Sequence, residues 1–279
     1  MPVCWKKVWA KDDNIFTLTG LRAEKKWGLY NEGFLRTTQI PKNYLLNDKQ
    51  EIQVKADRQG KPHIDPKAIQ PFFNRLEYPL HFLDFETFNP AIPMFDGSSP
   101  YQQIPFQFSL HIQEKPNGKV KHHSWIWNGS GDPRQELLSR LKGLLGREGS
   151  IIVYNAQFEK MILKQSVKAA KVVPSYDNWL QGILDRFVDL LEPFRAFHYY
   201  HPDQHGSASI KSVLPVLTGK SYDDMEISNG GMASTEYMRV MFTAEGKKDR
   251  SKVFKQLEEY CGLDTMGMVE ILGKLSKIL

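Results

Sequence analysis

The chain has 279 residues, of which 41% are hydrophobic and 25% charged, and this hydrophobic content excludes a chain that is disordered throughout. No apolar run reaches the ~18 residues that a membrane span needs, so we expect no membrane partner, whereas the net charge of +5 permits a polyanionic one. Two cysteines, Cys4 and Cys261, are too few for a disulfide scaffold and favour a reducing, cytoplasmic location.

Residues 1–77 are polar and rich in lysine, and we expect them to form a small N-terminal appendage. A strand edge is predicted at 15–18 and a short helix at 21–30. Asp65 and Pro66 have the pattern of an N-cap followed by proline at the first helical position, which predicts that a second short helix begins there.

From residue 78 onward the sequence contains longer apolar runs. The predicted elements are, in chain order, strands at 79–86, 106–112 and 120–127, a helix from 132 to 145, a strand at 150–154, a helix at 156–170, a strand at 186–191, a helix at 209–217 and one long helix or two at 252–278. Residues 228–250, rich in glycine and then in charge, are expected to form a mobile flap. This order predicts an α/β fold in which a mixed sheet is flanked by helices.

A pair of carboxylates lies at the end of the first of these strands. Asp84 and Glu86 are two residues apart, so in a strand both side chains point to the same face. Two buried like charges repel each other, and a divalent cation with hard oxygen ligands, Mg²⁺ or Mn²⁺, would relieve this cost. A solvated strand end is the alternative, and the same spacing recurs at Asp224 and Glu226 in a polar loop.

A second motif follows the strand at 150–154. Asn155 comes directly after this strand, and Glu159 lies in the first turn of the next helix, with Phe158 available for the core. Taken alone, this pattern favours plain helix capping, because asparagine and an early glutamate both stabilise a helix start.

A third motif lies on the C-terminal helix. Tyr260 and Asp264 are four residues apart, so a phenol and a carboxylate project from one helix face. The same spacing occurs at other places in the chain, but those copies lie in predicted loops. Only this copy lies on an amphipathic helix.

The three motifs and their order resemble the DEDD superfamily of exonucleases, in particular its tyrosine-bearing branch, which has a ribonuclease H-like fold. The matching residues are Asp84 and Glu86 in the first motif, Asn155 and Phe158 in the second, and Tyr260 and Asp264 in the third. The sequence departs from the family at Glu159, where aspartate is usual. The resemblance spans 78–278 and divides the chain into a connecting segment, 1–77, and an exonuclease-like domain, 78–279.

This resemblance implies an enzyme, a 3′–5′ exonuclease that hydrolyses phosphodiester bonds of single-stranded DNA or RNA by a two-metal mechanism. The implied ligands of two Mg²⁺ or Mn²⁺ ions are Asp84, Glu86, Glu159 and Asp264. Tyr260 would orient the attacking water. Asp189, at the end of the next strand, is the reserve ligand if Glu159 cannot reach the metals.

A closer resemblance lies in the stretches 83–87, 100–107 and 206–211, which are similar to an uncharacterised bacterial domain family. Its members are often fused behind a RecB-like nuclease domain, which implies such a domain or protein as a partner. Two alternatives to the exonuclease follow. One is a non-catalytic nucleic-acid-binding module that accompanies a separate nuclease, and the other is an endonuclease or resolvase of the same fold.

The expected substrate contacts are Thr87, Phe88, Asn155 and Lys211. Phe88 is one of several aromatic residues after the first motif, and aromatic rings can stack on nucleotide bases. Lys211 is suited to a phosphate contact, with a plain surface lysine as an equal alternative.

Three histidines, His198, His201 and His205, cluster in one predicted loop. Such spacing can bind zinc, although no fourth ligand follows at helical spacing. Substrate contact or a plain surface position is therefore favoured over a zinc site.

Overall fold

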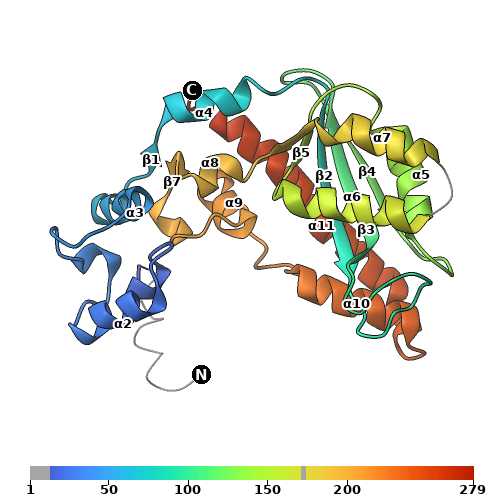
Figure 1. Ribbon diagram of the computed structural model, residues 1–279, viewed down its shortest axis with the longest axis horizontal. Helices are drawn as coiled ribbons and strands as arrows, with labels where there is room; N and C mark the ends of the chain where they lie inside the picture. The colour runs from blue at the N-terminus through green and yellow to red at the C-terminus, as the bar shows by residue number, and fades with distance from the viewer. Residues whose placement is uncertain (1–12, 171–173) are drawn as a thin grey trace. The chain divides into compact units, whose positions relative to one another are not determined.

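The computed structural model describes residues 13–170 and 174–279, which form two compact units (Figure 1). Of the described residues, 13–74, Leu191–Lys220 and Lys274–Leu279 belong to the first unit, and 75–170, 174–190 and Ser221–Gly273 belong to the second. The division expected at residue 77 thus differs from these units, because 191–220 and the C-terminal residues group with the N-terminal segment.

The second unit contains a five-stranded mixed sheet in the order β4-β3-β2-β5-β6. Its strands are β2 (Leu80–Phe88), β3 (Ile104–Gln113), β4 (Val120–Ile126), β5 (Ile151–Val153) and β6 (Phe187–Asp189). Strands β2, β3 and β4 pair antiparallel, whereas β5 runs parallel to β2 and β6 parallel to β5. The predicted α/β fold with a mixed sheet flanked by helices is confirmed.

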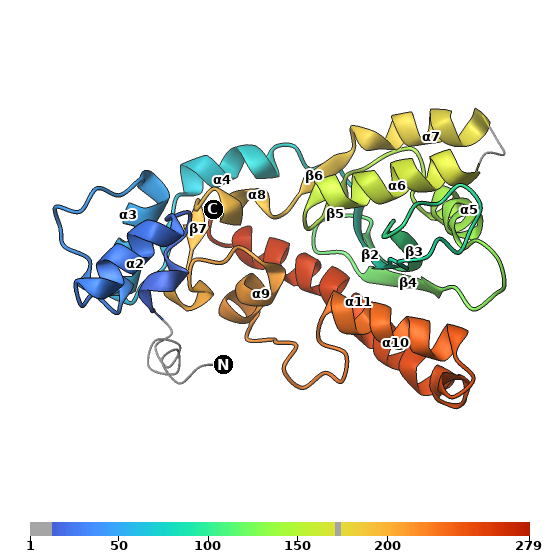
Figure 2. The same ribbon diagram turned by 60° about the horizontal axis from the view of Figure 1, so that its bottom comes forward.

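Helices cover both faces of this sheet (Figures 1 and 2). On one face α5 (Arg134–Leu144) and α6 (Ala156–Ala170) pack against each other and against β3, and α7 (Pro174–Leu184) packs on α6. On the other face lies α11 (Arg250–Leu275), whose Thr265 hydroxyl bonds Ser109 at 2.7 Å. Because both faces are covered, nearly all residues of β2 and β3 are buried.

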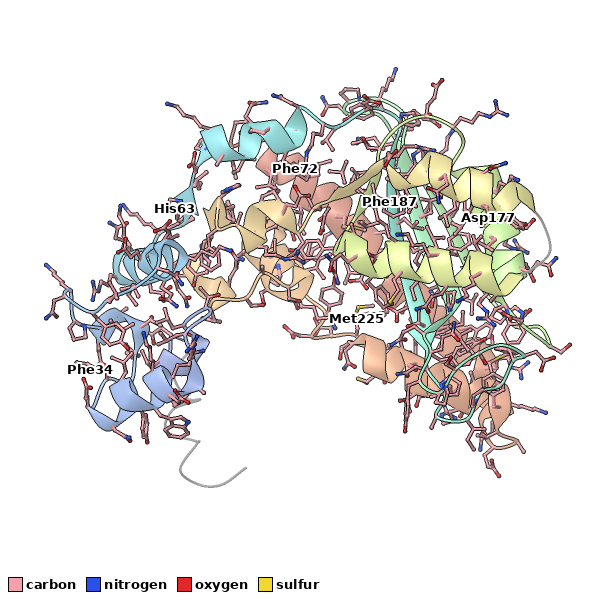
Figure 3. The ribbon with its side chains drawn as sticks, in the orientation of Figure 1. Phe34, His63, Phe72, Asp177, Phe187 and Met225 are labelled. Atoms are coloured by element: carbon pink, nitrogen blue, oxygen red, sulfur yellow. The ribbon has the colours of Figure 1, made fainter. Side chains whose placement is uncertain are left out.

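Strand β6 forms one edge of the sheet and is shielded by α6. The ring of Phe187, labelled in Figure 3, lies 5.4 Å from the ammonium nitrogen of Lys160 on α6. This cation–π contact joins α6 to the edge strand, and an edge covered by a helix is protected from pairing with another chain. Among the described residues no helix is long and apolar enough to cross a membrane.

The first unit is mainly helical. Its elements are α2 (Ala23–Asn31), α3 (Asp48–Gln59), α4 (Pro66–Phe73), α8 (Glu192–Arg195), α9 (Ile210–Thr218) and the antiparallel pair β1 (His63–Ile64) and β7 (Tyr199–Tyr200). Asp65 Oδ1 accepts a hydrogen bond from the Ala68 N–H at 3.0 Å, so the predicted cap of α4 is confirmed. A hydrophobic core of its own includes Ile15, Leu29 and Val54.

The strand edge predicted at 15–18 is wrong. Ile15–Thr17 form a 3-10 helix instead, and Asn14 Oδ1 accepts a hydrogen bond from the Phe16 N–H at 3.0 Å. A side-chain cap of this kind competes with strand pairing for the backbone donors.

The mobile flap predicted at 228–250 is also wrong. This segment contains α10 (Gly230–Phe242) and a 3-10 helix (Gly246–Asp249). Tyr237 on α10 stacks on Phe106 of β3 at a centroid distance of 3.7 Å, and its hydroxyl donates to the Trp127 carbonyl. These tertiary contacts stabilise a helix that the paired glycines alone disfavour.

Gly149 precedes β5 in a left-handed conformation with a φ of +83°, and a Cβ there would lie 2.0 Å from the Pro79 carbonyl oxygen. We expect Gly149→Ala to lower the free energy of unfolding by about 3 kcal/mol or more, measured by denaturant titration. Gly146 is the matched control: its φ is +54° and nothing lies near its Cβ position, so Gly146→Ala should cost only about 1 kcal/mol. Equal losses of stability in the two variants would contradict the close approach of the Gly149 Cβ position to the Pro79 carbonyl oxygen.

Candidate metal centre

Two of the predicted site residues lie on β2, on the face that α11 covers. Asp84 pairs with Ser109 and Glu86 with Gln107 in the antiparallel register with β3. Asp84 is partly exposed and Glu86 is buried. The strand spacing therefore places both carboxylates on one face, as predicted.

The start of α10 lies beside Glu86. A Cβ at Gly230 would be 3.6 Å from Glu86 Oε2, and Asn229 caps the helix by accepting the Met232 N–H at 2.9 Å. The free N–H groups and the dipole of a helix N-terminus favour a negative charge at this position. The segment that sequence patterning assigned to a flap thus contributes to the surroundings of the site.

Helix α11 brings the third motif to these carboxylates. The thiol of Cys261, between Tyr260 and Asp264 in the chain, donates to Asp84 Oδ2 at 3.4 Å. One donor atom from each of Asp84, Glu86 and Cys261 lies within 4.8 Å of the others. Burial raises the pKa of the Asp84 carboxyl well above its usual value, and the charge of Asp264 raises it further.

Glu159, in the first turn of α6, lies close enough to Asp84 for the two charges to interact. Its side chain is only 2% exposed, and its Oε2 atom has no hydrogen-bond partner among the described residues. Burial raises the pKa of the Glu159 carboxyl well above its usual value, and the charges of Asp84 and Asp189 raise it further. Glu159 is therefore a buried carboxyl with one free oxygen beside other carboxylates.

Asp189 at the end of β6 has a structural contact. Its Oδ1 accepts the backbone N–H of Asn155 at 2.9 Å, at the point where the chain turns from β5 into α6. Asn155 has a φ of +96°, and its carbonyl accepts the Phe158 N–H at the start of the helix. Asparagine tolerates this left-handed conformation better than most residues, which accounts for Asn155 in the motif.

We expect Glu159→Gln to weaken Mn²⁺ binding by about tenfold or more, because it removes the charge of the carboxyl with the free oxygen. Asp189→Asn is the matched control and should weaken binding less, since Asp189 already holds the Asn155 N–H. Titration calorimetry would measure both affinities. A larger loss in Asp189→Asn would make Asp189 the fourth ligand.

Tyr222 belongs to the site, although nothing in its sequence neighbourhood predicts it. Its hydroxyl donates to Asp264 Oδ1 at 2.6 Å, and its ring contacts that of Tyr260 edge to face at 5.9 Å. Burial and then the charge of Asp264 raise the pKa of both phenols, so each remains a protonated donor at neutral pH. Tyr222 fixes the orientation of Asp264.

Cys261 was also not predicted as a site residue. A signal was present, because Cys261 precedes Asp264 by three residues and such positions share a helix face. From the sequence alone, the number of cysteines indicates only a reducing environment.

The residues expected to contact substrate differ in how exposed they are. Thr87 is partly exposed, and its hydroxyl donates to Gln103 Oε1 at 2.6 Å. Phe88 is 0% exposed and packs among Phe106 and Tyr237, so its expected role in base stacking is corrected to one in the core. Tyr101, a further aromatic residue after the first motif, is exposed at 68%.

Lys211 lies in the first unit, at the start of α9, and the carboxylates all lie in the second unit. His201 Nδ1 accepts the Asp203 N–H at 3.2 Å, which caps the 3-10 helix Pro202–Gln204. Over residues 13–170 and 174–279 the one group of three potential metal ligands is Asp84, Glu86 and Cys261. The histidines at 198–205 thus form no such group.

Fold and site together define an α/β protein with a buried carboxylate cluster. The model of a domain family described as "Domain of unknown function (DUF2779)" matches residues 81–209. This match includes the motifs on β2 and α6, whereas the motif on α11 lies beyond it. The chain is therefore similar to an uncharacterised domain family over these residues. This match agrees with the resemblance to an uncharacterised bacterial domain family and does not extend to the DEDD superfamily.

Three curated relatives are similar over most of this chain. The "Uncharacterized protein MG366 homolog" of Mycoplasma pneumoniae is 23% identical over 257 residues, which cover 86% of this chain and 38% of that protein. "Uncharacterized protein MG366" of Mycoplasma genitalium is 22% identical, covering 94% and 44%, and "Uncharacterized protein UU173" of Ureaplasma parvum is 24% identical, covering 76% and 33%. The chain thus spans less than half the length of each relative. No solved structure matches it.

Proposed function

We propose that this protein is a metal-dependent 3′–5′ exonuclease that hydrolyses single-stranded nucleic acid. One observation carries the proposal: carboxylates from β2, α6 and α11, far apart in the chain, lie so close that Asp264 raises the pKa of Asp84, and Asp84 raises that of Glu159. Perturbed carboxyl groups of this kind are typical of catalytic and metal sites.

The donor set fits a pair of hard divalent cations. Carboxylate oxygens suit Mg²⁺ and Mn²⁺, and Glu159 Oε2 is a buried oxygen that still lacks a partner. The residues that would hold the ions are Asp84, Glu86, Glu159 and Asp264. Bound ions would supply an activated water and neutralise the charge that develops on the phosphate and the leaving oxygen.

The side chains around these ligands have separate tasks. Tyr260 keeps its hydroxyl proton at neutral pH, so it can orient the attacking water by a hydrogen bond. Tyr222 holds the Asp264 carboxylate in one orientation through its 2.6 Å hydrogen bond. Asp84 contacts α11 through Cys261, the residue three positions before Asp264, and would be one of the ligands that hold the ions.

The sheet supports the same class of enzyme. An antiparallel β2–β3–β4 meander followed by β5 and β6 parallel to β2 is the arrangement expected of a ribonuclease H-like fold. The 3′–5′ polarity, the single-stranded substrate and a RecB-like nuclease partner rest on the sequence resemblance alone, and we include them in the proposal on that basis.

A degradation assay tests the proposal. Single-stranded DNA and RNA of one sequence, labelled at the 5′ end, are incubated with the protein and Mg²⁺ or Mn²⁺. We expect a ladder that shortens from the 3′ end, stops with chelator and leaves circular single-stranded DNA intact. Cleavage of the circle would make the protein an endonuclease. Binding without degradation under every metal condition would make it a nucleic-acid-binding module.

A further inference from the structure

A thiol lies inside the carboxylate cluster. Cys261 Sγ is 3.4 Å from Asp84 Oδ2 and 3.9 Å from the Asp84 carbonyl oxygen, and Cys261 is fully buried. Sites for Mg²⁺ use oxygen donors, so a sulfur donor is not needed for the proposed hydrolysis. The thiol instead adds a soft donor to a site that is otherwise hard.

We propose that Cys261, Asp84 and Glu86 form a site for a thiophilic divalent cation of the zinc class. Two ligands of a tetrahedral zinc ion, a sulfur at about 2.3 Å and an oxygen at about 2.1 Å, lie about 3.6 Å apart. The separation of Cys261 Sγ and Asp84 Oδ2, 3.4 Å, is close to this value. The donor atoms of all three residues lie within 4.8 Å, so small side-chain rotations bring them onto one ion.

Glu159 gives an independent reason to expect a cation here. Its Oε2 atom is buried and has no partner among the described residues, and the carboxyl lies within electrostatic reach of Asp84. An oxygen in this state gains a partner when a cation binds beside Asp84. The three donor atoms that lie within 4.8 Å of one another, one sulfur and two oxygens, come from Cys261, Asp84 and Glu86, and thiolate and carboxylate donors both bind zinc.

Binding is an exchange of a proton for a metal ion. The S–H bond of Cys261 breaks, its proton goes to solvent, and a metal–sulfur bond forms without any change in oxidation state. The same carboxylates are those proposed for Mg²⁺ or Mn²⁺, so a zinc-class ion would exclude the hard ions and inhibit hydrolysis. This regulatory consequence rests on the proposed function, whereas the binding itself does not.

Cadmium binding tests the site without any substrate. Cd²⁺ is the probe, because a cadmium–thiolate bond has its own ultraviolet charge-transfer absorption. A Cys4→Ser background leaves Cys261 as the single thiol. We expect this protein to bind Cd²⁺ with the thiolate band, and Cys261→Ser in that background to lose the band and to lower the Cd²⁺-to-Mn²⁺ affinity ratio by about tenfold or more.

Carboxylate variants and a fold control complete the test. Adding Asp84→Asn and Glu86→Gln to the Cys4→Ser protein should weaken Cd²⁺ binding by about tenfold or more, and Asp224→Asn should not. The proposal is overturned if the Cys4→Ser protein shows no thiolate band, or if the band is independent of the carboxylates. If circular dichroism shows that Cys261→Ser is unfolded, Cys261→Ala replaces it in the comparison. The presence or absence of the thiolate band in the Cys4→Ser protein tests the site in either case. A normal band with no hydrolysis would refute the exonuclease and leave this site standing.

Discussion

Asp84→Asn is expected to lower metal-dependent hydrolysis of single-stranded nucleic acid by about a thousandfold or more. Asp84 interacts with carboxylates from two other elements: Asp264 on α11 raises its pKa, and its own charge raises the pKa of Glu159 on α6. Asparagine keeps the shape and one oxygen but removes the charge that would hold two cations. Initial rates of 3′ shortening on labelled DNA and RNA measure the effect.

The chain offers a matched control in its second Asp-x-Glu pair. Asp224 and Glu226 have the same spacing but are exposed in a loop, so Asp224→Asn should leave the rate within about twofold. Thermal unfolding should show that Asp84→Asn is folded and no less stable than the wild type, because it removes a carboxyl whose ionisation burial disfavours. Full activity in a folded, metal-supplied Asp84→Asn protein would refute the proposed mechanism.

Without divalent cations, Asp84 and Glu159 are expected to make the fold less stable as pH rises. The folded-state pKa of each carboxyl is raised above its unfolded value, which is about 4. Their contribution to stability is therefore fully present below that unfolded value and is lost as pH rises through the folded-state pKa. Each unit of difference corresponds to about 1.4 kcal/mol at high pH.

The double variant Asp84→Asn/Glu159→Gln isolates this effect from other titrating groups, because they are common to both proteins. Its free energy of unfolding, minus that of the wild type, should increase by at least about 1 kcal/mol between pH 4 and pH 8. Asp224→Asn should show no such increase. If this difference in the free energy of unfolding does not change between pH 4 and pH 8, the folded-state pKa values of the two carboxyls are not raised.

Added cations should reverse the loss at high pH. A cation at a hundred times its dissociation constant stabilises the folded state by about 2.7 kcal/mol if it binds that state alone. We expect Mn²⁺ to raise the melting temperature of the wild type at pH 8 and to have little effect on the double variant. An equal rise in both proteins would indicate binding elsewhere.

Several elements could be predicted from the sequence because their signals are local. Apolar runs bounded by turn residues gave the strands of the sheet, and the Asp65 cap gave the start of α4. The helix α10 could not be predicted, since two glycines begin it and its stability comes from Tyr237 packing on β3. The same limit applies to Phe88, whose burial depends on α10.

The site divides in the same way. The sequence by itself determined that Asp84 and Glu86 share a strand face and that Tyr260 and Asp264 share a helix face, because side-chain periodicity is a property of each element. Only the tertiary structure decided that α11 lies against β2, which brought Cys261 to Asp84, and that the segment before α10 lies against α11, which brought Tyr222 to Asp264. These residues are 177 and 42 positions apart in the chain, so both contacts depend on how the elements pack, and no local pattern of residues encodes that packing.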